Sequence, residues 1–165
     1  MRYNKIRKMD ISNGPGVRVS IFFQGCAFHC TGCFNPETWD FDGGKEFNDE
    51  VINHILDLCN NDVISGISIL GGEPLNPKNI EGSTKLARAF REKYPNKTIW
   101  LWSGYLFDEY ICDKEIVNYL DVVVDGQFKI ELSNPILHYK GSSNQRVIDV
   151  QKSIKKGTII LYEDE

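Results

Sequence analysis

The sequence predicts an α/β protein, an incomplete and open (β/α) barrel whose sheet is mostly parallel. Three observations lead to this prediction: apolar strands alternate with amphipathic helices, the strands are apolar on both faces, and glycine-containing turns follow them. Strands that are apolar on both faces are typical of a parallel sheet covered by helices. A complete eight-fold barrel takes about 250 residues. A chain of 165 residues therefore predicts a barrel that is cut short.

The first half of the chain predicts two strands and two helices. Residues 17–23 are β-branched and aromatic, which favours a strand. Asn48 is a residue type that caps helices, and apolar side chains then recur at helical spacing over residues 49–60. Residues 67–70 predict a short strand followed by two glycines, and residues 78–94 predict a helix that stops before a proline.

The second half of the chain repeats this alternation. Residues 98–102 predict a strand followed by Ser-Gly, residues 107–120 a helix, and residues 121–124 a strand followed by Asp-Gly. Residues 135–139 and 158–162 predict further strands. Ligands of such sheets bind at the carboxyl ends of the strands, where these polar and glycine-containing turns lie.

We expect one domain over residues 1–165, with a core at about 10–146 and a C-terminal tail at 147–165 whose role the sequence leaves open. The chain has 19 basic and 23 acidic residues, and the resulting net charge of −4 argues against nucleic acid or an anionic membrane as a partner. The first ten residues lack the apolar centre of a secretory signal, and no apolar run approaches the roughly 18 residues of a membrane helix. We therefore expect a cytoplasmic protein.

Three of the five cysteines stand within eight residues, at Cys26, Cys30 and Cys33. The odd total excludes a fully paired disulfide framework, and cytosolic thiols stay reduced, so the C-x3-C-x2-C spacing indicates metal binding. The other two, Cys59 and Cys112, fall at apolar helical positions, where we expect them to be buried as small hydrophobic side chains.

Three thiolates on one short loop are compatible with two kinds of metal centre. A structural zinc site needs four ligands, and the local candidate for the fourth is His29, although it is adjacent to Cys30 and such neighbours rarely bind one ion together. A [4Fe–4S] cluster held by three cysteines instead leaves one iron open to another ligand. A non-catalytic zinc or iron–sulfur module, which binds a partner or transfers electrons, is the alternative from another functional class.

The C-x3-C-x2-C spacing resembles the signature of the radical S-adenosylmethionine (SAM) superfamily. Five further segments are Asn-Gly-Pro-Gly-Val-Arg at 13–18, Gly-Gly-Glu-Pro at 71–74, Trp-Ser-Gly-Tyr at 102–105, Asp-Gly-Gln-Phe at 125–128 and Lys-Gly-Ser-Ser-Asn-Gln-Arg at 140–146. In this order, over about residues 10–146, the segments resemble the family of glycyl-radical-activating enzymes that serve the anaerobic ribonucleoside-triphosphate reductase. The chain departs from the family at Lys140, where arginine is usual.

The resemblance implies a barrel of the radical SAM type with one [4Fe–4S] cluster per chain, whose ligands are Cys26, Cys30 and Cys33. SAM is expected to bind the open iron. The residues that match SAM-contacting positions of the family are Gly32, Cys33, Phe34, Gly72 and Ser103. No side chain needs to act as a general acid or base, so we expect none to be catalytic. Asp125 is left between a SAM contact and a turn cap, and Trp39, Trp100 and Trp102 are expected to be core or shielding side chains.

The resemblance also implies a reaction and its partners. The reduced cluster cleaves SAM, and the resulting 5′-deoxyadenosyl radical removes hydrogen from a glycine in the glycyl radical subunit of the anaerobic ribonucleoside-triphosphate reductase. A flavodoxin or ferredoxin-type protein is the expected electron donor. A short, open barrel would leave the site accessible to a polypeptide loop. The alternative within this class is an activating enzyme of pyruvate formate-lyase or of another glycyl radical enzyme.

Overall fold

Seven strands form one mixed sheet in the computed structural model, which describes residues 1–163. The order of the strands across the sheet is β3-β1-β2-β4-β5-β6-β7. The four central strands run parallel to one another and are β2 (Val17–Phe23), β4 (Ile64–Gly71), β5 (Thr98–Trp102) and β6 (Val122–Asp125). The outer strands are antiparallel to their neighbours and are β1 (Arg2–Asp10), β3 (Lys45–Glu46) and β7 (Arg146–Asp149).

The fold is thus α/β, and among the described residues no pairing joins the two edge strands, β3 and β7. A barrel of the radical SAM type stays a prediction. The strands predicted at residues 17–23 and 98–102 are confirmed with these bounds. The strand predicted at 67–70 lies within β4, and the strand predicted at 121–124 overlaps most of β6.

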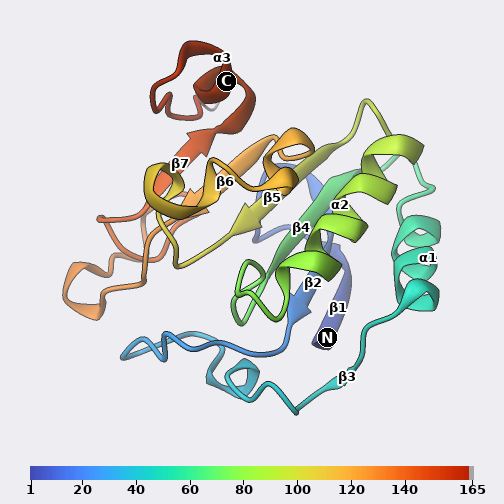
Figure 1. The fold of residues 1–165 in the computed structure, drawn as a ribbon, viewed down its shortest axis with the longest axis horizontal. Coiled ribbons are helices and arrows are strands. Elements are labelled where there is room, and N and C mark those ends of the chain that lie inside the picture. The colour runs from blue at the N-terminus through green and yellow to red at the C-terminus, as the bar shows by residue number, and fades with distance from the viewer. Residues whose placement is uncertain (164–165) are drawn as a thin grey trace.

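Two helices, α1 (Asp49–Leu58) and α2 (Ile80–Lys93), cover one face of the sheet (Figure 1). Both were predicted, and α1 is capped by Asn48, whose side chain accepts a hydrogen bond from the Val51 N–H. A third helix, α3 (Val150–Lys156), follows β7 directly. No helix within residues 1–163 combines the length and the apolar character needed to cross a membrane.

The helical stretch predicted over residues 107–120 is not one regular α-helix. The structure has a π-helical turn, η2 (Phe107–Ile111), and then a 3-10 turn, η3 (Glu115–Asn118). Phe107 and Ile116 are both buried in the core against the sheet. On a regular α-helix of about 3.6 residues per turn, side chains nine positions apart point in nearly opposite directions. The irregular path therefore lets both side chains reach the core.

The ends of the sheet also differ from the prediction. Residues 135–139 form turns rather than a strand, and residues 158–162 contribute only an isolated bridge between Leu161 and Ile148. The sequence analysis missed β1, β3, β7 and α3. Strand β1 carries charged side chains along an outer strand, so it lacks the continuous apolar run that marked the central strands.

The two faces of the central strands carry different side chains, because successive residues of a strand point in opposite directions. The face under α1 and α2 is mainly apolar and includes Val19, Ile21, Phe23, Ile67, Ile69, Ile99, Leu101 and Val123. The opposite face mixes polar and aromatic groups and includes Arg18, Ser20, Phe22, Ser68, Leu70, Trp100 and Trp102. C-terminal loops cover part of this second face, where the Tyr139 and Tyr162 rings pack edge-on against Trp100.

Arg18 is fully buried on this second face, near the start of β2. Its guanidinium donates hydrogen bonds to the Ser68 hydroxyl and the Ile67 carbonyl, both at 2.8 Å, and to the Thr98 hydroxyl and carbonyl at 2.9 and 3.0 Å. Burial lowers the pKa of Arg18 to about 10, so the group stays protonated at neutral pH. Because its acceptors belong to β4 and β5, this one side chain of β2 links three parallel strands.

Replacement of Arg18 by methionine is expected to destabilise the fold, because it leaves these buried oxygens without donors. We predict a loss of about 3 kcal/mol in the free energy of unfolding, measured by urea denaturation of the metal-free protein. Lys155→Met, which changes an exposed cation on α3, is the matched control and should stay within about 0.5 kcal/mol of the wild type. Equal stabilities of the two variants would contradict the role of Arg18.

Candidate functional site

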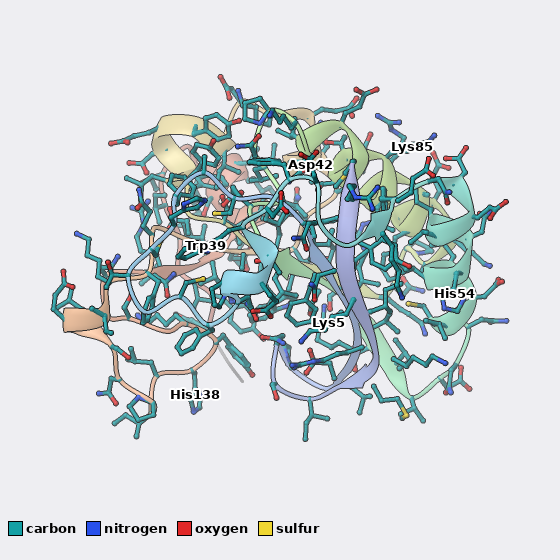
Figure 2. All side chains as sticks on the ribbon, turned by 90° about the horizontal axis from the view of Figure 1, so that it is seen from below. Lys5, Trp39, Asp42, His54, Lys85 and His138 are labelled. Atoms are coloured by element: carbon teal, nitrogen blue, oxygen red, sulfur yellow. The ribbon has the colours of Figure 1, made fainter. Side chains whose placement is uncertain are left out.

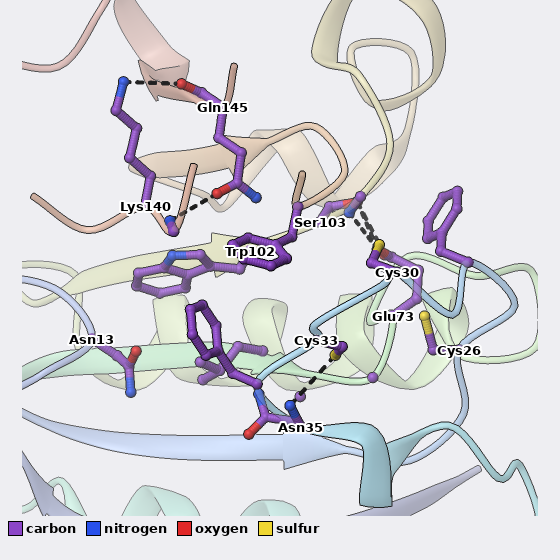
Figure 3. A pocket seen from close by; sticks show the side chains of 18 of the residues that line it. Asn13, Cys26, Cys30, Cys33, Asn35, Glu73, Trp102, Ser103, Lys140 and Gln145 are labelled. Atoms are coloured by element: carbon purple, nitrogen blue, oxygen red, sulfur yellow. Dashed lines mark hydrogen bonds between the residues drawn. The ribbon is translucent and has the colours of Figure 1, made fainter. Parts of the chain in front are cut away.

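A cavity of about 660 Å³ lies at the carboxyl ends of the central strands (Figure 3). Six of the seven predicted site residues line it: Cys26, Cys30, Cys33, Phe34, Gly72 and Ser103. Gly32 is the exception, since a Cβ placed there would meet the side chain of Ile130 rather than the cavity. The fold therefore brings residues from three strand ends to one place, and their roles toward a cofactor stay predictions.

The cysteine-bearing loop follows β2, and backbone hydrogen bonds join the two ends of the loop. The Gly25 N–H donates to the Thr38 carbonyl at 2.6 Å, and the Cys26 N–H donates to the Trp39 carbonyl at 3.1 Å. The short turn η1 (Pro36–Thr38) supplies one of these acceptors. The loop is thus closed by its main chain, which leaves the thiols free for other contacts.

All three cysteines of the loop are unpaired, with Cys26 buried and the other two half-buried. In residues 1–163, no three His, Cys, Asp or Glu side chains are gathered closely enough to hold a metal ion. Burial raises the pKa of Cys26 and of Cys30, so both are protonated thiols in this state. A metal centre would have to displace these protons and draw the sulfurs together.

The chemistry of the donor set fits an iron–sulfur cluster. Three thiols at one end of the same cavity are the soft ligands that such clusters take. His29, the candidate for a fourth zinc ligand, instead stacks on Trp39 with 4.4 Å between the ring centroids. Of the other histidines, His54 lies on α1 and His138 in a C-terminal loop, far apart from each other and from Trp39 (Figure 2).

The end of β4 lies directly against the base of the loop. The Gly72 N–H donates to the Phe23 carbonyl, and the Glu73 N–H donates to the Gly25 carbonyl, both at 2.8 Å. A Cβ at position 72 would lie 2.5 Å from the Gly25 oxygen and 2.9 Å from the Thr38 oxygen. Glycine is required at position 72 because the two backbones approach too closely for a side chain.

Glu73 is fully buried beside the cavity and joins the ends of β4 and β5. Its carboxylate accepts hydrogen bonds from the Gly104 N–H at 2.6 Å, from the Leu75 N–H at 2.8 Å and from the Ser103 hydroxyl at 3.0 Å. Burial raises the pKa of Glu73 to about 7, although these three donors oppose the shift. The Ser103 hydroxyl is therefore engaged with Glu73, a partner that the sequence analysis did not assign.

Asn79, at the start of α2, is a further residue that the sequence analysis missed. Its side-chain amide donates to the Gln24 carbonyl at 3.2 Å and to the Glu73 carbonyl at 3.0 Å. It thereby fixes the end of β2 to the end of β4. The sequence placed Asn79 in the first turn of the helix predicted over residues 78–94, and that position does not indicate this contact.

The aromatic side of the cavity presents an exposed ring. Phe34 is 70% exposed, and its ring lies 4.9 Å from that of Phe128, centroid to centroid. Both rings lie close to the backbone of Gly141. A flat, exposed aromatic face at the edge of a cavity is suited to stacking against a planar ligand.

Two open questions from the sequence are answered by burial and hydrogen bonding. Asp125 is fully buried and accepts hydrogen bonds from Arg146 at 3.0 and 2.6 Å and from the Phe107 N–H at 2.8 Å, so it braces the end of β6. Cys59 is buried in the core as expected. Cys112 is exposed, which corrects the prediction, because it follows the irregular turn η2 instead of lying within a continuous helix.

The tryptophans divide between the core and the cavity. Trp100 is buried on the second face of the sheet, as expected of a core side chain. Trp39 and Trp102 line the cavity. The indole N–H of Trp102 donates to the Tyr139 carbonyl at 2.7 Å, which fixes the ring in the cavity wall.

Gly72→Ala tests the close approach at the cavity. The added methyl should push the cysteine loop off β4, so we predict a loss of about 1–3 kcal/mol in the free energy of unfolding together with weaker iron binding. Gly82→Ala is the control, because its Cβ meets only the flexible end of the Met1 side chain and the edge of the Phe47 ring. Unfolding curves and iron content after anaerobic reconstitution check both variants. Normal iron content in Gly72→Ala would contradict the proposed tight fit.

Known proteins are similar to this chain over most of its length. A family model described as "4Fe-4S single cluster domain" matches residues 12–148. The anaerobic ribonucleoside-triphosphate reductase-activating protein of Salmonella typhi is 40% identical over 150 residues, which cover 89% of this chain and 97% of the relative. The protein of the same name from Escherichia coli (strain K12) is 39% identical with the same coverage.

A viral relative extends the match beyond bacteria. The anaerobic ribonucleoside-triphosphate reductase-activating protein of Enterobacteria phage T4 is 37% identical over 147 residues, which cover 89% of this chain and 93% of the relative. Identity at this level, over nearly the full length of both chains, shows common descent. The chain therefore belongs to the family of anaerobic ribonucleoside-triphosphate reductase-activating proteins, with a 4Fe-4S single cluster domain over residues 12–148.

Proposed function

We propose that this chain is a radical SAM activase that generates a glycyl radical on an anaerobic ribonucleoside-triphosphate reductase. One observation supports the proposal most strongly. The loop that carries Cys26, Cys30 and Cys33 is seated on the Gly71-Gly72-Glu73 turn, at a cavity large enough for a second ligand. The names of the relatives supply the partner.

In this proposal the three cysteines hold a [4Fe–4S] cluster with one iron free of protein ligands. When bound, the reduced cluster and SAM supply the one-electron cleavage and the hydrogen abstraction. The chain itself contributes position. The backbone at Gly72 lies close to the cluster loop, so SAM would meet main chain there, and the exposed Phe34 ring would stack against the adenine.

Glu73 and Ser103 have a supporting part in this site. Their mutual hydrogen bond holds the ends of β4 and β5 together at the cavity wall. Ser103 lies within the lining, so its backbone and side chain border the space that SAM would fill. No group of this set needs to transfer a proton in the reaction, and none is proposed to.

The cavity favours this proposal over a simple electron-transfer module. A protein that only passes electrons closes its cluster with four protein ligands and needs no adjoining space. Here the cysteine loop borders about 660 Å³ lined by polar and aromatic residues from four strand ends. The match to relatives over nearly their whole length favours the ribonucleotide reductase over pyruvate formate-lyase as the partner.

Anaerobic reconstitution with iron and sulfide, followed by dithionite and SAM, tests the proposed chemistry. We predict formation of 5′-deoxyadenosine and, with the anaerobic reductase present, a glycyl radical signal in electron paramagnetic resonance. Cys30→Ala should reduce both to background, because it removes a cluster ligand. Cys112→Ala is the matched control, since this cysteine is exposed and outside the cavity, and it should keep full activity. Absence of 5′-deoxyadenosine from the wild-type reaction would refute the proposal.

A partner protein has an apolar surface available around the cavity mouth. Ile136 is 79% exposed and lies between Pro135 and Leu137, which both line the cavity. Phe34 is exposed at the same mouth. Exposed apolar groups that rim a cavity are typical of a protein-binding surface. We infer that the reductase rests on this rim while its glycine enters the cavity.

Ile136→Asp tests the rim separately from the chemistry. A charge there should lower the yield of glycyl radical at limiting enzyme by about tenfold, while dithionite-driven cleavage of SAM without the reductase stays unchanged. Val63→Asp is the control, because Val63 is also exposed but precedes β4 at the opposite end of the strands. Radical yields are compared by electron paramagnetic resonance. Equal radical yields for Ile136→Asp and Val63→Asp would show that the rim is not part of the interface with the reductase.

A further inference from the structure

One of the three cysteine sulfurs is approached from outside its own loop. Cys30 Sγ lies 4.0 Å from Gln127 Oε1, and the backbone N–H of Phe128 faces the same sulfur and lowers its pKa. The hydrogen bonds to the other two come from within the loop or next to it: the N–H groups of Phe28 and His29 face Cys26, and the Asn35 N–H faces Cys33 at 3.4 Å. The segment after β6 therefore contacts the cysteine loop at Cys30.

A polar turn remote in sequence holds this segment in place. The side-chain amide of Gln145 donates to the Gly126 carbonyl at 2.9 Å, and that of Asn144 donates to the Gln127 carbonyl at 2.8 Å. The Gln145 amide oxygen accepts in turn from the Gly141 N–H at 2.9 Å, within its own turn (Figure 3). This turn belongs to the polar segment at residues 140–146, to which the sequence assigned no role. Its contacts fix the main chain from which Gln127 and Phe128 project.

We propose that Gln127 is a positioning residue for the cluster, which donates a hydrogen bond to the Cys30 thiolate and thereby raises the reduction potential of the cluster. The inference rests on the proposed function, because it requires a [4Fe–4S] cluster on Cys30. It adds a specific role for a side chain that neither lines the cavity nor ligates metal.

The direction of the hydrogen bond follows from the protonation state of the sulfur. In the metal-free protein the thiol can donate to the amide oxygen of Gln127. A ligating thiolate has no proton and only accepts, so the amide must turn its Nε2 group toward the sulfur. Rotation about the last side-chain torsion exchanges the two amide atoms with almost no change in shape.

The effect on potential follows from charge. The reduced cluster carries one more negative charge than the oxidised cluster. Hydrogen bonds to a ligating sulfur withdraw electron density from it and so favour the reduced state. Gln127 is exposed, and its removal leaves no cavity in the core. Its variants should therefore fold normally and report on the cluster rather than on stability.

The test measures the midpoint potential of the reconstituted cluster without SAM, by a dithionite titration followed by electron paramagnetic resonance. Gln127→Leu removes the donor and should lower the potential. Gln127→Glu replaces the donor by a negative charge at nearly the same shape and should lower it further. Iron and sulfide content should match the wild type in both. Thr31→Val is the control, since it alters an exposed side chain beside Cys30 and should leave the potential unchanged.

A fourth variant checks the turn. Gln145→Leu removes the hydrogen bond to Gly126 and should shift the potential in the same direction as Gln127→Leu, by a smaller amount, because Asn144 still holds the segment. Wild-type potentials in both Gln127 variants, on protein that carries the cluster, would overturn this inference and leave the proposed function intact. Failure of the wild type to assemble a [4Fe–4S] cluster would overturn the proposed function and this inference together.

Discussion

Glu73 lies just beyond the end of strand β4 and binds the ends of both neighbouring strands, β2 and β5. Its backbone N–H binds the Gly25 carbonyl at the end of β2, and its buried carboxylate binds Ser103 and Gly104 at the end of β5. A carboxylate without water at this depth is costly unless donors surround it. The donors come from the loops that form the cavity, so the site keeps its shape only while this carboxylate is satisfied.

This arrangement does not depend on the cysteine side chains. The loop is closed by main-chain hydrogen bonds at Gly25 and Cys26, and it is pressed against β4 where only glycine fits at position 72. None of these contacts uses a thiol. The base of the loop is therefore fixed while its three sulfurs remain available to a metal centre. The adjoining cavity holds no fourth cysteine among the described residues and leaves space for another ligand.

The sequence predicted the centre of the fold better than its edges. The four parallel strands are rich in apolar side chains, above all on the face that the helices cover, and such segments have few alternatives. Strand β1 is an outer strand rich in charge, and the irregular path after Phe107 depends on tertiary packing. In the site, cysteine spacing and glycine-containing turns marked loops that meet at one cavity. The hydrogen bonds of Glu73 and Asn79 depend on distances between strand ends, which a local sequence pattern cannot predict.

Our proposal requires that Cys26, Cys30 and Cys33 hold a cluster that is one protein ligand short, with SAM as the missing ligand. Electron–nuclear double resonance on the reduced, reconstituted protein with SAM labelled by 15N at its amino group tests this most directly. We expect a 15N coupling strong enough to require a bond from nitrogen to iron. A [4Fe–4S] signal that shows no such coupling, and does not change when SAM is added, would contradict it.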